Sequence, residues 1–253
     1  MKKERIDKLI VESGFSDSLK NAQALVMSGK VLVNEQRVDK PSELFSSEAK
    51  IRIKGEAEKH KYVGRGGLKL ERALNDFHIQ PNEYVCLDVG ASTGGFTDCL
   101  LQNGAKKVIS VDVGTNQIVW KLRNDEKVEV RENTNARNLK PEDFAEKFDL
   151  IVMDVSFISV TKIFCALLPL LKNKGKIITL VKPQFEVKKG EVGKGGVVRE
   201  TEKHKEVLLR VNQAAERIGL NISGVIESPI LGADGNKEFL VLYEKRNENQ
   251  ICR

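Results

Sequence analysis

A glycine-rich turn that follows an apolar segment is the feature of this sequence that most constrains its fold. Residues 85–95 read Val-Cys-Leu-Asp-Val-Gly-Ala-Ser-Thr-Gly-Gly and lead into the apolar segment 96–102. This order predicts a strand, a sharp turn and a helix, because glycine has no Cβ atom to obstruct the turn or the approach of a ligand to the backbone. We therefore expect a cofactor site between the end of the strand and the start of the helix.

The spacing of the glycines indicates the kind of cofactor. Dinucleotide-binding turns read Gly-x-Gly-x-x-Gly and phosphate loops end in Gly-Lys-Ser/Thr, whereas this turn has Gly90, Gly94 and Gly95 and no lysine. A second strand, 107–112, ends in Asp112 at the spacing of a ribose-binding carboxylate. These residues resemble the S-adenosylmethionine site of class I methyltransferases. The alternative is a tight turn without a ligand, which leaves the two acidic strand ends as a coincidence.

That resemblance implies roles for the residues around the turn. Asp88 would hold the methionine end of the cofactor, directly or through solvent, and Asp112 would hold the ribose hydroxyls. The other expected cofactor contacts are Gly90, Ala91, Ser92, Gly94, Gly95, Phe96, Val113 and Asp154.

The apolar pattern predicts two domains. The N-terminal part has apolar residues at three- and four-residue steps and then at every second residue, which predicts two short helices and a hairpin. Strands and helices then alternate, as in a parallel sheet covered on both faces. We expect an α/β fold, a class I (Rossmann-like) methyltransferase sheet with a small α+β domain before it. The domains would span 1–59 and 64–253, joined by a linker at 60–63.

The larger domain is expected to end in a hairpin that adds an antiparallel strand to the sheet. Its predicted strands are 84–89, 107–112, 128–131, 148–154, 176–182, 221–227 and 238–244, and its predicted helices are 96–102, 115–123, 160–171 and 201–218.

The first domain resembles the S4-type (alpha-L) RNA-binding domain, in the stretch that runs from Arg5 through Ala22 and Gln23 to Asn34. Such domains lay a basic helical face against folded RNA. Residues 1–59 hold 12 basic and 10 acidic side chains, so charge alone leaves solvated surface residues as the alternative. The expected RNA contacts here are Arg5, Lys20, Lys30, Arg37 and Lys40.

Two further apolar segments end in charged residues. Asp154 ends the strand 148–154, and Lys182 ends the strand 176–182. Ligands bind beyond the carboxyl ends of parallel strands, so both side chains should face the cofactor crevice. Burial lowers the pKa of a lysine, which would let Lys182 act as a base. Alternatively, Lys182 reaches solvent or only pairs with Asp154.

Four charged residues form a recognisable set. Lys69 in Arg-Gly-Gly-Leu-Lys-Leu and Glu238 in Gly-Asn-Lys-Glu-Phe join Asp154 and Lys182 in a set that resembles the Lys-Asp-Lys-Glu tetrad of FtsJ-type ribose 2′-O-methyltransferases. The resemblance implies that Lys182 is the base, positioned and tuned by the other three. Taken singly, Lys69 and Glu238 would be ordinary surface charges.

A glycine- and lysine-rich segment, 190–196, follows soon after Lys182. We expect a mobile loop that closes on RNA phosphate, although a plain surface loop has the same composition. The expected RNA contacts in the second domain are Arg65, Lys188, Lys189 and Lys194.

The order of these motifs over residues 3–245 resembles the TlyA (haemolysin A) family of ribosomal RNA methyltransferases. Membership would imply methylation of a cytidine 2′-oxygen in the RNA of the large and, in some members, the small ribosomal subunit, with ribosomal RNA or assembled subunits as partners. Gly64 stands where serine is usual, and the hairpin turn reads Asn34-Glu35 instead of Asn-Gly. Neither departure removes a catalytic group.

Composition argues against several other classes of protein. Net charge is +6, which suits a polyanionic partner without requiring one. The four cysteines and three histidines have no metal or disulfide spacing, and no apolar run is long enough to span a membrane. We expect a cytoplasmic monomer without metal, not a membrane-active haemolysin. A non-catalytic ribosome-binding module stays an alternative, whereas a pseudouridine synthase with an S4-type domain would lack the adenosylmethionine turn.

Overall fold

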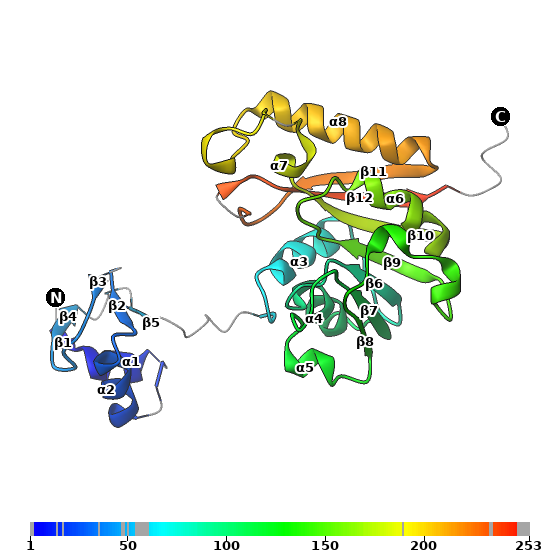
Figure 1. Ribbon diagram of the computed structural model, residues 1–253. Helices are drawn as coiled ribbons and strands as arrows, with labels where there is room; N and C mark the ends of the chain where they lie inside the picture. The colour runs from blue at the N-terminus through cyan, green and yellow to red at the C-terminus, as the bar shows by residue number, and fades with distance from the viewer. Residues whose placement is uncertain are drawn as a thin grey trace. The chain divides into compact units, whose positions relative to one another are not determined.

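The computed structural model divides the chain into two compact units, Met1–His60 and Lys61–Arg253 (Figure 1). Each unit has an apolar core of its own. The structure describes residues 3–13, 15–16, 18–34, 36–46, 49, 51–53, 61–188, 190–232 and 235–246.

The N-terminal unit builds one apolar core from two helices and two small sheets. Its described elements are β1 (Lys3–Arg5), α1 (Ile6–Glu12), α2 (Leu19–Met27), β2 (Val31–Val33), β3 (Gln36–Arg37), β4 (Leu44–Ser46) and β5 (Ile51–Ile53). Strand β2 pairs antiparallel with β3 and β5, and β1 pairs antiparallel with β4. The two helices and the β2–β3 hairpin agree with the prediction. The β1–β4 pair was not predicted, because three-residue strands carry almost no periodic signal.

The larger unit is built on a seven-stranded sheet with the order β11-β12-β10-β9-β6-β7-β8. Strand β12 runs antiparallel to β10 and β11, and the other neighbouring pairs are parallel. The predicted antiparallel strand is therefore confirmed, although it lies inside the sheet. The strands are β6 (Val85–Val89), β7 (Lys107–Val111), β8 (Val128–Arg131), β9 (Phe148–Met153), β10 (Leu171–Val181), β11 (Leu220–Glu227) and β12 (Phe239–Lys245).

Helices cover both faces of this sheet (Figure 1). The α-helices are α3 (Gly66–Asp76), α4 (Gly95–Gln102), α5 (Trp120–Arg123), α6 (Thr161–Leu167), α7 (Pro183–Glu186) and α8 (Thr201–Arg217). Alternate strand residues point to opposite faces, so Met153 and Val181 pack with α6 and α8, whereas Val152 and Leu180 pack with α3 and α4. Fully burying one such large side chain contributes about 1.5–3 kcal/mol.

Residues 61–63, which we had assigned to a linker, pack in the larger unit. The Tyr62 side chain is 2% exposed and lies in the core with α3 and α4. The Val63 amide donates to Asp98 Oδ2 at 2.9 Å. A Cβ atom at Gly67 would lie 2.3 Å from Tyr62 Cγ, so the glycine makes room for the ring. Helix α3 was not predicted, because glycines at its start are poor helix formers and hide the pattern.

The predicted helix 115–123 is shortened to α5. Asn116 has φ of 54°, in the left-handed region, and this conformation interrupts a helix. The Gln117 amide instead donates to Glu132 Oε1 at 3.0 Å. The polar run before Trp120 therefore forms a turn against the segment after β8.

Candidate active site

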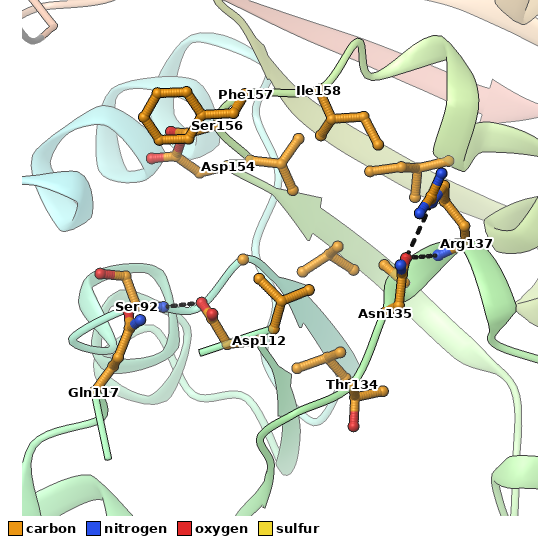
Figure 2. Close-up of a pocket in the computed structure, with 17 residues that line it drawn as sticks. Ser92, Asp112, Gln117, Thr134, Asn135, Arg137, Asp154, Ser156, Phe157 and Ile158 are labelled. Atoms are coloured by element: carbon orange, nitrogen blue, oxygen red, sulfur yellow. Dashed lines mark hydrogen bonds between the residues drawn. The ribbon is translucent and has the colours of Figure 1, made fainter. Parts of the chain in front are cut away.

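A cavity of about 440 Å³ opens at the carboxyl ends of β6, β7, β8 and β9 (Figure 2). This is the edge of the sheet at which the sequence predicted a ligand. The residues that line it include Gly90, Ser92, Asp112, Val113, Gln117, Thr134, Asn135, Arg137, Asp154, Ser156 and Phe157.

The turn after β6 depends on glycine at two positions. Gly90 has φ of 82°, and a Cβ atom there would lie 2.3 Å from the backbone oxygen of Asp154. Gly94 has φ of 99° and precedes the first residue of α4. Both conformations are strained for residues with a side chain. The backbone of this turn is consequently bare where it faces the cavity.

Asp112 holds a fixed orientation at the cavity wall (Figure 2). Its Oδ2 accepts a hydrogen bond from the Ser92 amide at 2.8 Å, and its Oδ1 accepts one from the Gly114 amide at 2.7 Å. Each oxygen keeps further acceptor capacity. The side chain can therefore accept hydrogen bonds from a vicinal diol, the chemistry that the sequence assigned to it.

Asp88 lies behind the cavity, not in its wall. The residue is completely buried, and its Oδ2 accepts from the Thr97 hydroxyl at 2.7 Å. Its Oδ1 has no partner among the residues that the structure describes. Burial raises the pKa of Asp88 to about 7, against the Thr97 hydrogen bond, which lowers it. The side chain points under the first turn of α4, which disfavours a direct contact with a ligand, and the contact through solvent stays a prediction.

A smaller cavity of about 130 Å³ shares Gly90, Ser92 and Asp154 with the larger one. Arg65, which we expected to contact RNA, lines this small cavity. Its remaining lining residues are Gly64, Gly66, Ala91, Thr93, Gly95 and Phe96. Among the predicted cofactor contacts, Asp88 and Gly94 line neither cavity.

Two ion pairs contain the four residues of the predicted tetrad. Lys182 Nζ lies 2.5 Å from Asp154 Oδ1, as a close ion pair without hydrogen-bond alignment, and it donates to Ser156 Oγ at 2.9 Å. Lys69 Nζ lies 2.5 Å from Glu238 Oε2. The exposed fractions of the Lys69, Glu238 and Lys182 side chains are only 10%, 2% and 11%.

Strand register explains why these pairs occupy one edge of the sheet. Val181 of β10 pairs with Phe239 of the antiparallel β12, so Lys182, which follows β10, and Glu238, which precedes β12, lie at the same level. Asp154 directly follows β9, the other neighbour of β10. Because successive residues of a strand point to opposite faces of the sheet, Asp154, Lys182 and Glu238 all lie on the face that α3 covers. Helix α3 carries Lys69.

Phe157 is a site residue that the sequence analysis missed. Its side chain is 90% exposed, its φ of 65° is left-handed, and its ring lies 5.0 Å from that of Phe185. Left-handed backbone is strained for a bulky residue and clusters at functional sites. An aromatic residue just beyond a strand-end carboxylate was the available signal. The polar run Thr134–Arg137 after β8 was missed as well.

The predicted RNA contacts fall into different environments. The Arg5 guanidinium pairs with Asp7 at 2.6 Å, and this arginine holds the pKa of the buried Asp7 carboxyl below its usual range. Arg37 pairs with Asp39 at 2.6 Å on the surface. Among the lysines predicted to contact RNA, the exposed ones are Lys20, Lys30, Lys40 and Lys188. Lys189 and the side chain of Lys194 lie outside the described part of the chain.

The glycine-rich segment is anchored at its end. The Asn236 side chain is 1% exposed, accepts from the Val198 amide at 3.0 Å and donates to the Gly196 oxygen at 3.0 Å. Asn236 lies two residues before Glu238. The end of the segment is thus hydrogen-bonded to a residue close to Glu238 of the tetrad, so the segment is fixed at this end.

The described ranges contain neither a metal-binding cluster nor a membrane-spanning helix. No group of three or more histidine, cysteine, aspartate or glutamate residues in them could hold a metal ion. None of the described helices has the length and hydropathy needed to span a bilayer.

Family models match both units. The model of the FtsJ-like methyltransferase matches residues 62–245, and the S4 domain model matches residues 4–51. The chain belongs to the FtsJ-like methyltransferase family. It carries an S4 domain before the methyltransferase domain.

Curated and solved relatives cover nearly the whole chain. Hemolysin A of Brachyspira hyodysenteriae is 42% identical over 94% of this chain and 99% of its own. The 16S/23S rRNA (cytidine-2′-O)-methyltransferase TlyA of Mycobacterium tuberculosis is 40% identical over 99% of this chain and 93% of its own. The solved structure of a protein named as a hemolysin, from Streptococcus thermophilus, is 45% identical in sequence and has a TM-score of 0.74. The match covers 98% of this chain and 90% of that one.

Proposed function

We propose that this FtsJ-like methyltransferase transfers a methyl group from S-adenosylmethionine to a cytidine 2′-hydroxyl of ribosomal RNA in the cytoplasm. The observation that carries the proposal is that the ion pairs Lys182–Asp154 and Lys69–Glu238 occupy the end of the sheet where the cavity lies, with Asp154 in the cavity wall. The name of the mycobacterial relative supports cytidine in large- and small-subunit RNA as the substrate.

The cavities fit S-adenosylmethionine. Asp112 would accept the ribose hydroxyls, and the bare backbone at Gly90 would let the ligand lie against the turn. The smaller cavity would take the amino-acid end, and the absence of a lysine in the turn suits a cofactor without a pyrophosphate. When bound, the cofactor supplies a methyl group activated by a sulfonium charge.

Lys182 is the proposed base. It would take the proton of the 2′-hydroxyl onto Nζ while the oxygen is held about 3 Å from the methyl carbon. Asp154 and Ser156 would orient the amine. Glu238 would hold the Lys69 amine in place.

Phe157 is the proposed platform for the target base. Its exposed ring stands three residues after Asp154 and lines the cavity. Stacking of a nucleobase on an aromatic side chain contributes about 1–3 kcal/mol per base. A nucleotide held in this way would present its ribose to the neighbouring Lys182.

The N-terminal unit is the proposed RNA-docking part. Its exposed Lys20, Lys30 and Lys40 can approach phosphates freely, and the partly exposed Arg5 would approach them while it is paired with Asp7. Phosphate contacts of this kind position an RNA without reading its sequence. Selection of the nucleotide would then fall to the methyltransferase cavity.

The proposal is tested with purified protein, labelled S-adenosylmethionine and ribosomal subunits that lack the modification. We expect label in a 2′-O-methylated cytidine of the RNA. Lys182→Ala should abolish the product and still bind S-adenosylhomocysteine. Unlabelled RNA from every subunit tested would contradict the proposal.

A further inference from the structure

Glu186 is a buried carboxylate that the proposed reaction does not use. It ends α7, is 8% exposed and lines neither of the two cavities. Its Oε1 accepts from the Val160 amide at 2.8 Å, and its Oε2 accepts from the Ser159 hydroxyl at 2.7 Å. Burial raises the pKa of Glu186, and these two hydrogen bonds oppose that rise. A buried carboxylate is costly unless its oxygens are hydrogen-bonded, and here both are.

The partners of Glu186 lie at the end of the loop that carries the proposed active groups. This loop, residues 154–160, follows β9 and holds Asp154, Ser156 and Phe157. Ser159 and Val160 form its last two positions, just before α6 begins at Thr161. The Ser159 hydroxyl also lies 2.7 Å from the Thr161 hydroxyl, which joins the loop end to the helix.

The segment 182–186 contacts this loop at three successive points. Lys182 contacts Asp154 and Ser156. The Phe185 ring contacts the Phe157 ring. Glu186 then holds Ser159 and Val160. Among these three contacts, the one that Glu186 makes involves no group with a role in the proposed reaction.

The far side of Glu186 is fixed to a long helix. Its backbone oxygen accepts a hydrogen bond from Arg210 of α8. Helix α8 packs on the sheet through Val207, Val211 and Ala215. Glu186 therefore joins a well-packed element to the end of the loop.

We propose that Glu186 is a positioning residue, which fixes the loop 154–160 so that Asp154, Ser156 and Phe157 keep their places opposite Lys182. The proposal rests on the proposed function of Lys182. Without the carboxylate, the Val160 amide and the Ser159 hydroxyl would be left near the protein interior without this partner, and the loop would shift toward other partners. Misplacement of reacting groups by about 1 Å can cost a hundredfold in rate.

The experiment compares Glu186→Ala with Glu186→Gln in single-turnover methyl transfer. Glutamine can still accept from the Val160 amide and can donate to the Ser159 hydroxyl. We expect kcat to fall about tenfold to a hundredfold in Glu186→Ala, with unchanged affinity for S-adenosylhomocysteine, and to recover to within about threefold of wild type in Glu186→Gln.

A matched control separates positioning from stability. Asp149 lies on β9 at the opposite end from the active site, where its Oδ2 accepts from the Val85 amide at 2.9 Å and from Lys172 at 2.8 Å. Asp149→Ala should lower the free energy of unfolding and leave kcat of the folded protein unchanged. Ser159→Ala, which keeps Glu186 and removes one of its two hydrogen bonds, should lower kcat by a smaller factor even if Glu186→Ala does not fold.

Three results would overturn the positioning role. They are wild-type kcat in both Glu186→Ala and Ser159→Ala, equal loss of kcat in Asp149→Ala, and failure of Glu186→Gln to recover activity. If wild-type protein itself makes no product, the proposed function fails. The positioning role is then read from a crystal structure of Glu186→Ala, where a displaced loop 154–160 supports it and an unmoved loop contradicts it.

Discussion

Asp112 is a carboxylate whose orientation is set by backbone amides alone. Because Ser92 and Gly114 hold its two oxygens, little side-chain freedom is lost when a ligand binds. Its hydrogen bonds to a ligand would be of the charged kind, which contribute about 1.5–3 kcal/mol.

Replacing Asp112 should therefore weaken cofactor binding. We expect Asp112→Ala to lower the affinity for S-adenosylhomocysteine about tenfold to a hundredfold, as measured by calorimetry. Asp125→Ala is the control, because the Asp125 side chain accepts from the nearby Lys127 amide on the surface and does not line the cavity. Equal affinities of Asp112→Ala and wild type would rule out the assigned role.

Asp88 gives a stability prediction with a definite pH dependence. Its pKa is about 7 in the folded protein against an ordinary 3.8, so ionising it costs stability progressively as the pH rises from about 4 to 7, and the cost persists above 7. Asp88→Asn can still accept from Thr97. At pH 8 the variant should be more stable than wild type by up to about 4 kcal/mol.

The measurement is denaturant unfolding of both proteins without ligand at several pH values. The difference should shrink toward zero as the pH falls to about 4. A variant that is less stable than wild type at pH 8 would show that ionised Asp88 has partners that stabilise it.

Individual side chains show how much of the candidate site could be predicted from the sequence alone. It predicted Asp154, Lys182, Lys69 and Glu238 because motif order identified them, and the structure joins them in two pairs. It could not predict the partners that Arg5 and Asp88 have in the fold, because a sequence does not say which group a side chain contacts. Their predicted RNA and ligand contacts stay predictions. Arg5 found the carboxylate two residues along, and Asp88 found a helix turn.

At the scale of elements, most strands and helices follow from their apolar period. The strand ends at Asp154 and Lys182 were predictable because a largely apolar run stops directly before each of them. Helix α3 was not, because its glycines fit around Tyr62, a contact that depends on tertiary structure. The turn before α5 depends on the left-handed Asn116, which no periodic pattern reports.

The loop between β11 and β12 leads to an element-scale prediction. Gly232 packs against Glu238, and a Cβ atom there would lie 2.0 Å from Glu238 Oε1. Its backbone conformation suits alanine, since its φ is not left-handed. Gly232→Ala should displace the Glu238 carboxylate from Lys69 and lower kcat at least about tenfold.

The free energy of unfolding should fall, because the buried Glu238 carboxylate loses its partner Lys69. Cofactor binding should change little, because Gly232 and Glu238 line neither cavity. Thermal unfolding and calorimetry with S-adenosylhomocysteine check both. Wild-type kcat in Gly232→Ala would mean that the Lys69–Glu238 pair does not need its present geometry.

The whole molecule consists of two units whose cores share no described residue. Because the cavities and both ion pairs belong to the larger unit, cofactor binding should survive removal of the smaller one. RNA binding should weaken, because the proposed docking part is the S4 domain.

A fragment of residues 55–253 tests this division. It should bind S-adenosylhomocysteine with wild-type affinity, bind ribosomal subunits more weakly, and show a smaller salt dependence of binding because fewer phosphate contacts are made. Undiminished methylation of subunits by the fragment would contradict the assignment of RNA docking to the smaller unit.

The central claim is that the Lys182 amine removes the proton of the attacking hydroxyl, and the most direct measurement is the single-turnover rate of Lys182→Met with saturating S-adenosylmethionine. Methionine keeps most of the length of the side chain without the amine. The account predicts a rate lower by about 10²–10⁴-fold, with S-adenosylhomocysteine affinity within about threefold of wild type. A rate within a few-fold of wild type would contradict it.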